Sequence, residues 1–275
     1  MKIQFLGTAA AEGFPALYCQ CESCLLAWKN KGRNIRSRCQ ALVDDKILID
    51  FGPDTYYHML QHNVPLDTIH HVIITHNHSD HFYSSELEFR RKGFAAKVEE
   101  EPLYVYGAKS TFDETNRIIE AEQMPEYVQA RLIKPFEMFK IMDYEIIPLA
   151  ANHDPKSDPV FYLITKGDKT ILYAHDTGVF PKESWDFLEK FGKHIDLVSL
   201  DCTAGILQGW RWGHLSFDVF MEVVNEMKTK NIIDENTKIY ANHFSHNGNA
   251  TYDQMKEVAS KVGVDVAYDG MVVEF

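Results

Sequence analysis

The chain has 275 residues, 45% of them hydrophobic, and a formal net charge of −12. A chain of this length buries about three quarters of its unfolded surface, which is enough for one large α/β core. That length is also compatible with two domains, but we expect a single domain over residues 1–275, because the candidate site residues described below are spread from residue 76 to residue 243 and must converge. The acidity argues against a broad nucleic-acid-binding surface, because such surfaces are normally basic.

Residues 2–6 predict a first strand that ends at Gly7. This opening lacks the charged head and long apolar segment of a signal peptide. No apolar run reaches the length of a membrane span, so we expect no membrane contact and a cytoplasmic protein. The small-residue loop 7–15 has neither the dinucleotide-binding nor the P-loop glycine spacing, which favours a tight connection to the cysteines beyond it.

Three of the five cysteines lie close together, at Cys19, Cys21 and Cys24. In a cytosolic chain such a cluster favours metal binding over disulfides. A structural zinc site usually has four ligands, so the fourth must come from elsewhere in the chain. Cys39 and Cys202 are candidates, although their apolar, strand-like surroundings indicate small core residues.

Strands and helices alternate through the first half of the chain. The expected elements are a β-hairpin over 41–49 that ends at Asp50, a short helix over 55–61, a wholly apolar strand over 72–74, a helix over 84–92, a strand over 103–106, and a helix opened by the capping-box pair Thr111 and Glu114. The 72–74 strand is of the kind buried on both faces of a sheet.

Three histidines and one carboxylate directly follow the 72–74 strand: His76, His78, Asp80 and His81. Neutral imidazole and carboxylate are ligands of divalent metals such as zinc. His76 and His78 face the same side of an extended segment, and a bend into a helix would turn Asp80 and His81 toward a second ion. An exposed polar loop is the alternative, but such loops rarely begin at the carboxyl end of a buried strand, where α/β sites form.

The second half continues the alternation and adds isolated polar residues after its strands. The expected elements are strands over 144–147, 161–164, 170–173, 195–200 and 238–240, a helix with Trp185 and Leu188 in its core stripe, a helix capped by Ser216, a helix opened by Thr251 and Gln254, and two closing strands within 264–275. His153, Asp176 and His243 follow three of these strands.

The H-x-H-x-D-H motif and the isolated residues, taken in order, resemble the metallo-β-lactamase superfamily. Its signature has an Asp after an early strand, the histidine cluster, a lone His, a lone Asp and a last His. These stations correspond here to Asp50, residues 76–81, His153, Asp176 and His243. The resemblance covers nearly the whole chain and implies an α/β fold, the four-layer αββα sandwich, with a metal site at one edge of the sheets.

The resemblance also implies two divalent metals in the active site, either zinc, manganese or iron. One metal would be held by His76, His78 and His153. The other would be held by Asp80, His81 and His243. Asp176 would bridge the two, and Asp50 would be a structural aspartate. Since every position carries a competent ligand, a degenerate, non-catalytic site is the weaker alternative.

A narrower resemblance is carried by the cysteine cluster and His246, which lies three residues after His243. In these features the chain is similar to the branch that contains the phosphoribosyl cyclic phosphate phosphodiesterase of phosphonate metabolism. In that branch three cysteines and such a histidine hold a structural zinc. The resemblance therefore implies a closed, non-catalytic zinc site formed by Cys19, Cys21, Cys24 and His246. His246 could instead be a surface histidine. The opening of the chain also resembles pyrroloquinoline-quinone biosynthesis B type proteins.

His214 lies in the interval where the phosphodiesterase branch carries an active-site histidine. A histidine with a pKa near 6.5 could protonate a leaving alkoxide or hold a phosphate oxygen, or it could only pack at a helix start. The preceding loop 208–212 contains two tryptophans and an arginine. It could form a rim that stacks a base or sugar, or an interface patch.

These features predict a metal-dependent hydrolase, and first a phosphodiesterase for a small, cyclic or linear, nucleotide or phosphosugar. Metal-bound hydroxide would attack phosphorus, with Asp80 in the metal centre and His214 assisting the leaving group. The alternatives are a tRNA-processing nuclease, another ester or lactone hydrolase, and a cofactor-biosynthesis carrier that binds without cleaving. The expected partner is a small phosphorylated substrate, and a homodimer is compatible with the sequence.

Overall fold

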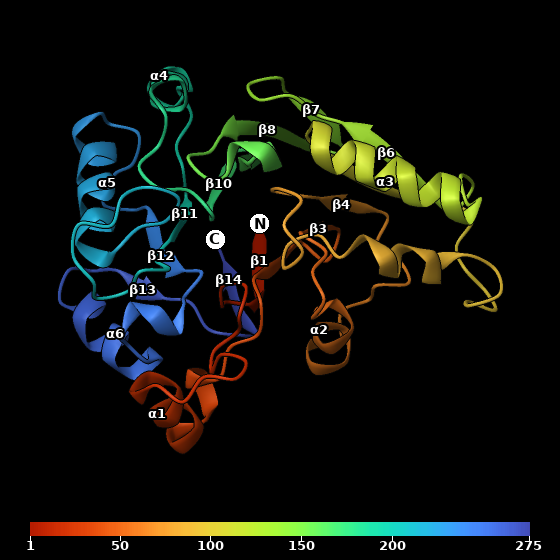
Figure 1. Ribbon diagram of the computed structural model, residues 1–275. Helices are drawn as coiled ribbons and strands as arrows, with labels where there is room; N and C mark the ends of the chain where they lie inside the picture. The colour runs from red at the N-terminus through yellow and green to blue at the C-terminus, as the bar shows by residue number, and fades with distance from the viewer.

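The computed structural model describes residues 1–275 and contains two seven-stranded sheets with helices outside them (Figure 1). The first sheet has the order β14 (Met271–Glu274), β1 (Lys2–Gly7), β2 (Gln40–Val43), β3 (Ile47–Ile49), β4 (His71–Ile73), β5 (Leu103–Gly107) and β6 (Val128–Leu132). The second has the order β13 (Asp265–Val266), β12 (Lys238–Asn242), β11 (Leu197–Asp201), β10 (Lys169–Ala174), β9 (Val160–Lys166), β8 (Tyr144–Ala150) and β7 (Phe139–Ile141).

Each sheet combines a parallel block with an antiparallel one. Strands β3 to β6 are parallel in the first sheet, and strands β10 to β13 are parallel in the second. The remaining neighbours are antiparallel, including the hairpins β2–β3 and β9–β10 that the sequence predicts. The parallel strands bring their carboxyl ends to one edge of each sheet, which is where sites form in α/β proteins.

Six α-helices and four short 3₁₀ segments complete the fold. The helices are α1 (Glu22–Asn30), α2 (Thr55–His62), α3 (Lys109–Glu122), α4 (Lys182–Lys190), α5 (Phe217–Thr229) and α6 (Tyr252–Ser260). The 3₁₀ segments are η1 (Gly32–Asn34), η2 (Ser84–Arg90), η3 (Pro155–Ser157) and η4 (His246–Gly248). None of these helices is long and apolar enough to cross a membrane.

Three apolar clusters show how the layers pack. The middle cluster lies between the sheets and joins Phe5 of β1 to Tyr162 of β9. A second cluster packs α3 against the outer face of the first sheet through Ile118. A third packs α4, α5 and α6 against the other outer face, with Trp185 and Phe220 among its members. Both faces of each sheet are therefore covered, and the predicted four-layer αββα sandwich is confirmed.

Local boundaries differ from the prediction in two places. The helix expected over 84–92 is the 3₁₀ segment η2. Helix α3 begins at Lys109, so Thr111 is inside the helix and is no capping residue. Thr111 is fully buried because it packs on Gly107, where an added Cβ would lie 2.3 Å from its Cγ2. The capping box of Thr251 and Gln254 at the start of α6 is confirmed.

Candidate metal centre

The predicted ligands meet at the edge formed by the carboxyl ends of strands from both sheets. The histidine motif follows β4, and His153 follows β8. Asp176 follows β10, and His243 follows β12. The loop after β3 comes very close to the motif, since a Cβ added to Gly52 would lie 2.0 Å from the carbonyl oxygen of Asp80. Glycine is required there because any side chain would push the motif away from the sheet.

The ligand atoms of these residues form two neighbouring groups. His76, His78 and His153 make one group, and Asp80, His81 and His243 make another; within each, the ligand atoms all lie within 4.8 Å of one another. Asp176 lies between them. Its Oδ2 is 3.0 Å from Nε2 of His81 and 2.9 Å from Nε2 of His243, and its Oδ1 is 3.7 Å from Nε2 of His153. The geometry thus matches the arrangement that the resemblance implies.

Each histidine has one ring nitrogen held by a neighbour and the other turned toward the cluster. Nδ1 of His81 lies 2.7 Å from Oδ2 of Asp50. Nδ1 of His243 lies 2.7 Å from Oγ1 of Thr203. The corresponding neighbours of the other three histidines are Oγ1 of Thr75 for His76, the carbonyl oxygen of Gly213 for His153, and Oδ2 of Asp154 for His78. Such outer contacts fix the tautomer of histidines that bind metals.

Four buried atoms in the centre of the cluster make no hydrogen bond of good geometry, although Oδ2 of Asp176 lies within 3.0 Å of Nε2 of His81 and of His243. They are Nε2 of His76, His81 and His243 and Oδ2 of Asp176. Buried polar atoms are normally hydrogen-bonded, and a nitrogen or carboxylate oxygen without a partner is what a metal ion satisfies. These residues therefore fit a site for divalent metals, whose ligands are imidazole and carboxylate.

The electrostatics of the cluster favour a cation. Burial alone disfavours charge on His81, yet Asp176, Asp80 and Asp50 together raise its pKa well above the ordinary value. Burial alone would raise the pKa of Asp176, but His243 and His81 hold it well below the usual range. Several carboxylates are thus ionised in a buried space, and positive charge must accompany them.

Three residues of the site adopt left-handed backbone conformations. The φ angles are +68° at Asp50, +49° at Asp176 and +60° at His243. Non-glycine residues rarely adopt positive φ, and such conformations are found where the surrounding structure enforces them, often at functional sites. Here each one lies within two residues of the end of a strand and turns its side chain into the cluster.

Asp201, at the end of β11, is an important member of the site that the sequence analysis did not identify. It is fully buried and accepts hydrogen bonds from the backbone N–H groups of Asp176, Thr203 and Leu215. Its Oδ2 also lies 3.0 Å from Nδ1 of His214. Its position at a strand end, like that of Asp50 and Asp176, was the available signal.

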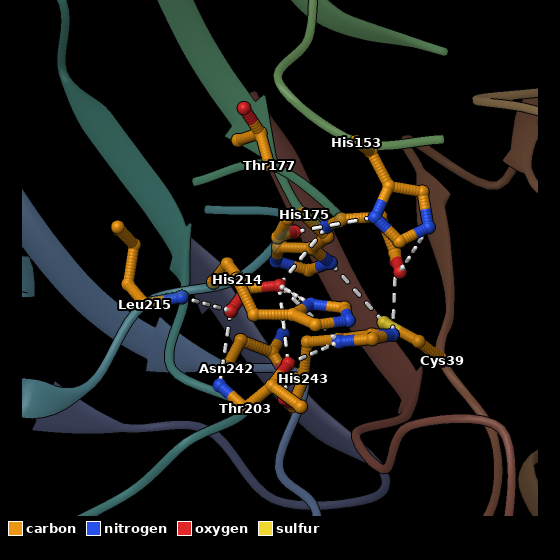
Figure 2. A network of polar contacts seen from close by, with 12 residues as sticks. Cys39, His153, His175, Thr177, Thr203, His214, Leu215, Asn242 and His243 are labelled. Carbon is orange, nitrogen blue, oxygen red and sulfur yellow. Dashed lines mark hydrogen bonds and ion pairs between the residues drawn. The ribbon is translucent and has the colours of Figure 1, made fainter. Parts of the chain in front are cut away.

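His214 lies beside the predicted metal ligands. Figure 2 shows its ring next to that of His243, and the two rings stack with centroids 5.7 Å apart. One of its ligand atoms is within 4.8 Å of those of His153 and Asp176. Burial lowers the pKa of His214, but Asp201 outweighs it and raises the pKa above the ordinary value. Asp201 thus favours the protonated form of His214 relative to a free imidazole.

The fold also brings the three clustered cysteines together with His246. Nδ1 of His246 lies 3.4 Å from Sγ of both Cys19 and Cys21, and Cys24 completes the group. Burial alone raises the pKa of Cys21, but hydrogen bonds from Cys24 and His246 lower it to about 6, which favours the metal-binding thiolate. Cys39 and Cys202 are buried core residues, as their surroundings predicted.

A pocket of about 340 Å³ opens on the paired ligands. Its walls include Glu12 of the opening loop, Trp210 and His214. A second groove of about 840 Å³ lies on the other side of His153, which borders both, and contains Lys109, Lys134 and Trp212. The loop 208–212 therefore separates the two spaces, and its tryptophans are exposed, as a rim requires.

Comparison with known proteins gives a family and several relatives. A family described as the beta-lactamase superfamily domain matches residues 45–234. Ribonuclease Z of Lactobacillus helveticus (strain DPC 4571) is 29% identical over 110 residues, which cover 39% of this chain and 30% of that protein. The chain thus matches less than a third of the length of this curated relative.

Two solved structures resemble the whole chain. A diphosphatase from the PhnP family is 20% identical with a TM-score of 0.72, and the match covers 100% of this chain and 98% of that one. Zn²⁺-bound PqqB from Methylobacterium extorquens is 18% identical with a TM-score of 0.73, and the match covers 100% of both chains. At these identities the likeness concerns the fold.

Proposed function

The chain belongs to the beta-lactamase superfamily, a hydrolase fold that holds divalent metals, and on this basis we propose that it is a two-metal phosphodiesterase for a small phosphorylated substrate. The observation that supports this proposal is the convergence of imidazole and carboxylate ligand atoms, four of which are buried and make no hydrogen bond of good geometry. We propose zinc, manganese or iron in the paired site and zinc in the cysteine cluster.

The chemistry of the pocket supports phosphodiester hydrolysis. When bound, a pair of divalent metals ionises water near neutral pH and neutralises charge on phosphoryl oxygens. His214 would supply a proton to the leaving group. Asp201 holds its Nδ1, so Nε2–H is free to donate a proton to the departing alkoxide. Burial lowers the pKa of His214, but Asp201 outweighs burial and raises it, which favours the protonated form that a general acid requires.

The remaining residues position the metal-binding side chains and shape the substrate pocket. Asp50 orients His81, and Thr203 orients His243, through their Nδ1 atoms. Asp80 contributes a carboxylate to the paired site, 3.1 Å from Nε2 of His81. The pocket of about 340 Å³ has the size of a small-molecule site, which supports a mononucleotide or phosphosugar.

A tRNA-processing nuclease is the second candidate. It is supported by the similarity to ribonuclease Z of Lactobacillus helveticus and by the groove beyond His153, where Lys109 and Lys134 could face a phosphate backbone. The formal net charge of −12 opposes it, because RNA-binding surfaces are normally basic.

The test is a substrate panel on purified protein with its metal content measured. The panel contains cyclic nucleotides, linear phosphodiesters, a precursor tRNA, lactones and thioesters, and Asp176→Ala is the control. We expect about three metals per chain and turnover of small phosphodiesters that the variant lacks. Cleavage of precursor tRNA alone would favour the nuclease. A single zinc per chain with no hydrolysis of any ester would instead indicate a carrier.

A further inference from the structure

Glu12 lies between the cysteine cluster and the paired-metal pocket. It belongs to the opening loop, which is attached to the segment after β12 by two hydrogen bonds: Ala10 N–H to the carbonyl oxygen of Phe244, and Phe244 N–H to that of Thr8. Glu12 lines the pocket together with Asp80, Asp176 and His243. The same segment carries His243 into the paired site and His246 into the cysteine cluster.

The contacts of Glu12 join the two sites directly. Its Oε1 accepts a hydrogen bond from Oγ of Ser245 and lies 3.5 Å from Nε2 of His246. The other ring nitrogen of His246, Nδ1, faces Sγ of Cys19 and Cys21 at 3.4 Å. His246 is therefore held between a carboxylate on one side and thiols on the other.

A histidine that binds a metal through Nδ1 carries its proton on Nε2. A carboxylate that accepts a hydrogen bond from this N–H fixes the tautomer and the ring orientation and makes Nδ1 a better ligand. In this chain the carboxylate in that position is Glu12. Its side chain is 30% exposed, so it is also accessible to a ligand in the pocket.

We propose that Glu12 is a positioning residue shared by both sites: it orients His246 for a metal in the cysteine cluster, and the cluster in turn fixes Glu12 in the pocket wall. The pocket half of this inference rests on the phosphodiesterase function proposed above, whereas the metal half does not. A carboxylate in the wall repels a second anionic group and accepts hydrogen bonds from hydroxyl or amino groups. Glu12 thus selects substrates with one phosphodiester and a neighbouring hydrogen-bond donor over substrates with an additional phosphate.

The metal half is tested by Glu12→Gln, with Glu22→Gln as the matched control. Glu22 is an exposed acid next to Cys21 at the start of α1, so its variant has the same change of charge. Co²⁺ is titrated into each metal-free full-length protein against a competing chelator. The thiolate-to-cobalt absorption band reports the cysteine cluster alone, because the paired site has no thiolate. We expect Glu12→Gln to weaken Co²⁺ binding by about 10–100-fold and Glu22→Gln to leave it unchanged. Equal affinities in the two variants overturn this half.

The pocket half is tested by kinetics on the zinc-saturated variants. The substrates are a phosphodiester and the same diester with an additional terminal phosphate. We expect Glu12→Gln to lower KM for the second substrate relative to the first, and Glu22→Gln to keep the wild-type ratio. An unchanged KM ratio in Glu12→Gln overturns this half. Absence of all hydrolysis in the wild type would instead refute the proposed function, and the cobalt titration would still decide the role of Glu12 at the cluster.

Discussion

Asp201→Asn should lower the stability of the protein by about 4 kcal/mol. Both carboxylate oxygens of Asp201 are buried acceptors. Oδ1 accepts from the N–H groups of Thr203 and Leu215, and Oδ2 accepts from the N–H of Asp176 and the hydroxyl of Thr203 and faces Nδ1 of His214. Whichever oxygen the amide NH₂ replaces, at least two donors lose their acceptor. Each buried donor without a partner costs about 1–3 kcal/mol, which gives the expected total.

Asp196→Asn is the matched control, because Asp196 precedes the same strand, β11. Its two oxygens have one donor each, Nζ of Lys169 and the N–H of Thr170. An amide keeps its oxygen on Thr170 and loses only the partly exposed ion pair, which is worth up to about 1 kcal/mol.

The assay is urea unfolding of wild type and both variants in excess chelator, so that bound metals do not contribute. We expect Asp201→Asn to shift the midpoint much more than Asp196→Asn. Equal shifts, or a loss below about 1 kcal/mol in Asp201→Asn, would refute the view that Asp201 organises this edge of the sheet.

Four further outcomes follow from the site and its surroundings. Asp176→Ala should lose turnover and the paired metals while the cysteine cluster keeps its zinc; metal analysis that finds all metals retained would contradict the bridging role. Cys21→Ser should lose one zinc and some thermal stability but keep the paired metals, and loss of every metal would argue against separate sites. His214→Ala should keep all metals yet slow turnover by about 10²–10⁴-fold; an unchanged kcat removes it from the reaction. Burial lowers the pKa of His58 from 6.5 to about 3, so the unfolded chain binds its proton more readily, and the contribution of neutral His58 to stability falls by about 2 kcal/mol between pH 6.5 and 5. His58→Gln should show a shallower pH dependence in urea unfolding, and parallel curves would disprove it.

The sequence predicted which side chains meet in the paired site because their chemistry is concentrated. His76, His78, Asp80 and His81 lie together after an apolar strand, and the isolated His153, Asp176 and His243 each follow a strand. The parallel strands β4, β10 and β12 bring three of these ends to one edge. Strand β8, which precedes His153, is joined to β10 through two antiparallel pairings and so runs in the same direction. Residue types and strand positions were therefore enough to predict which side chains meet.

Asp201 was missed because its chemistry depends on its surroundings. It is the last residue of an otherwise apolar strand, and nothing local distinguishes it from an ordinary strand end. Its role comes from N–H groups of the chain at positions 176, 203 and 215, which only the tertiary fold assembles.

Glu12 was missed for a similar reason. The loop that carries it was interpreted as a connection, and the contact with His246 joins residues 234 positions apart. The start of α3 was predicted wrongly because Thr111 packs locally against Gly107, the last residue of β5, which a capping pattern cannot reveal.

The positive φ angles at Asp50, Asp176 and His243 lower the stability of the fold but place three side chains in the site. Glycine reaches that conformation without steric penalty, whereas each of these residues holds it at a cost of about 1–3 kcal/mol. Glycine at these positions would relax the backbone but remove two of the predicted metal ligands, Asp176 and His243, and the Asp50 carboxylate that orients His81. A variant of this chain chosen only for thermal robustness would therefore drift toward an inert scaffold, and screens for stabilised forms should keep these three positions fixed.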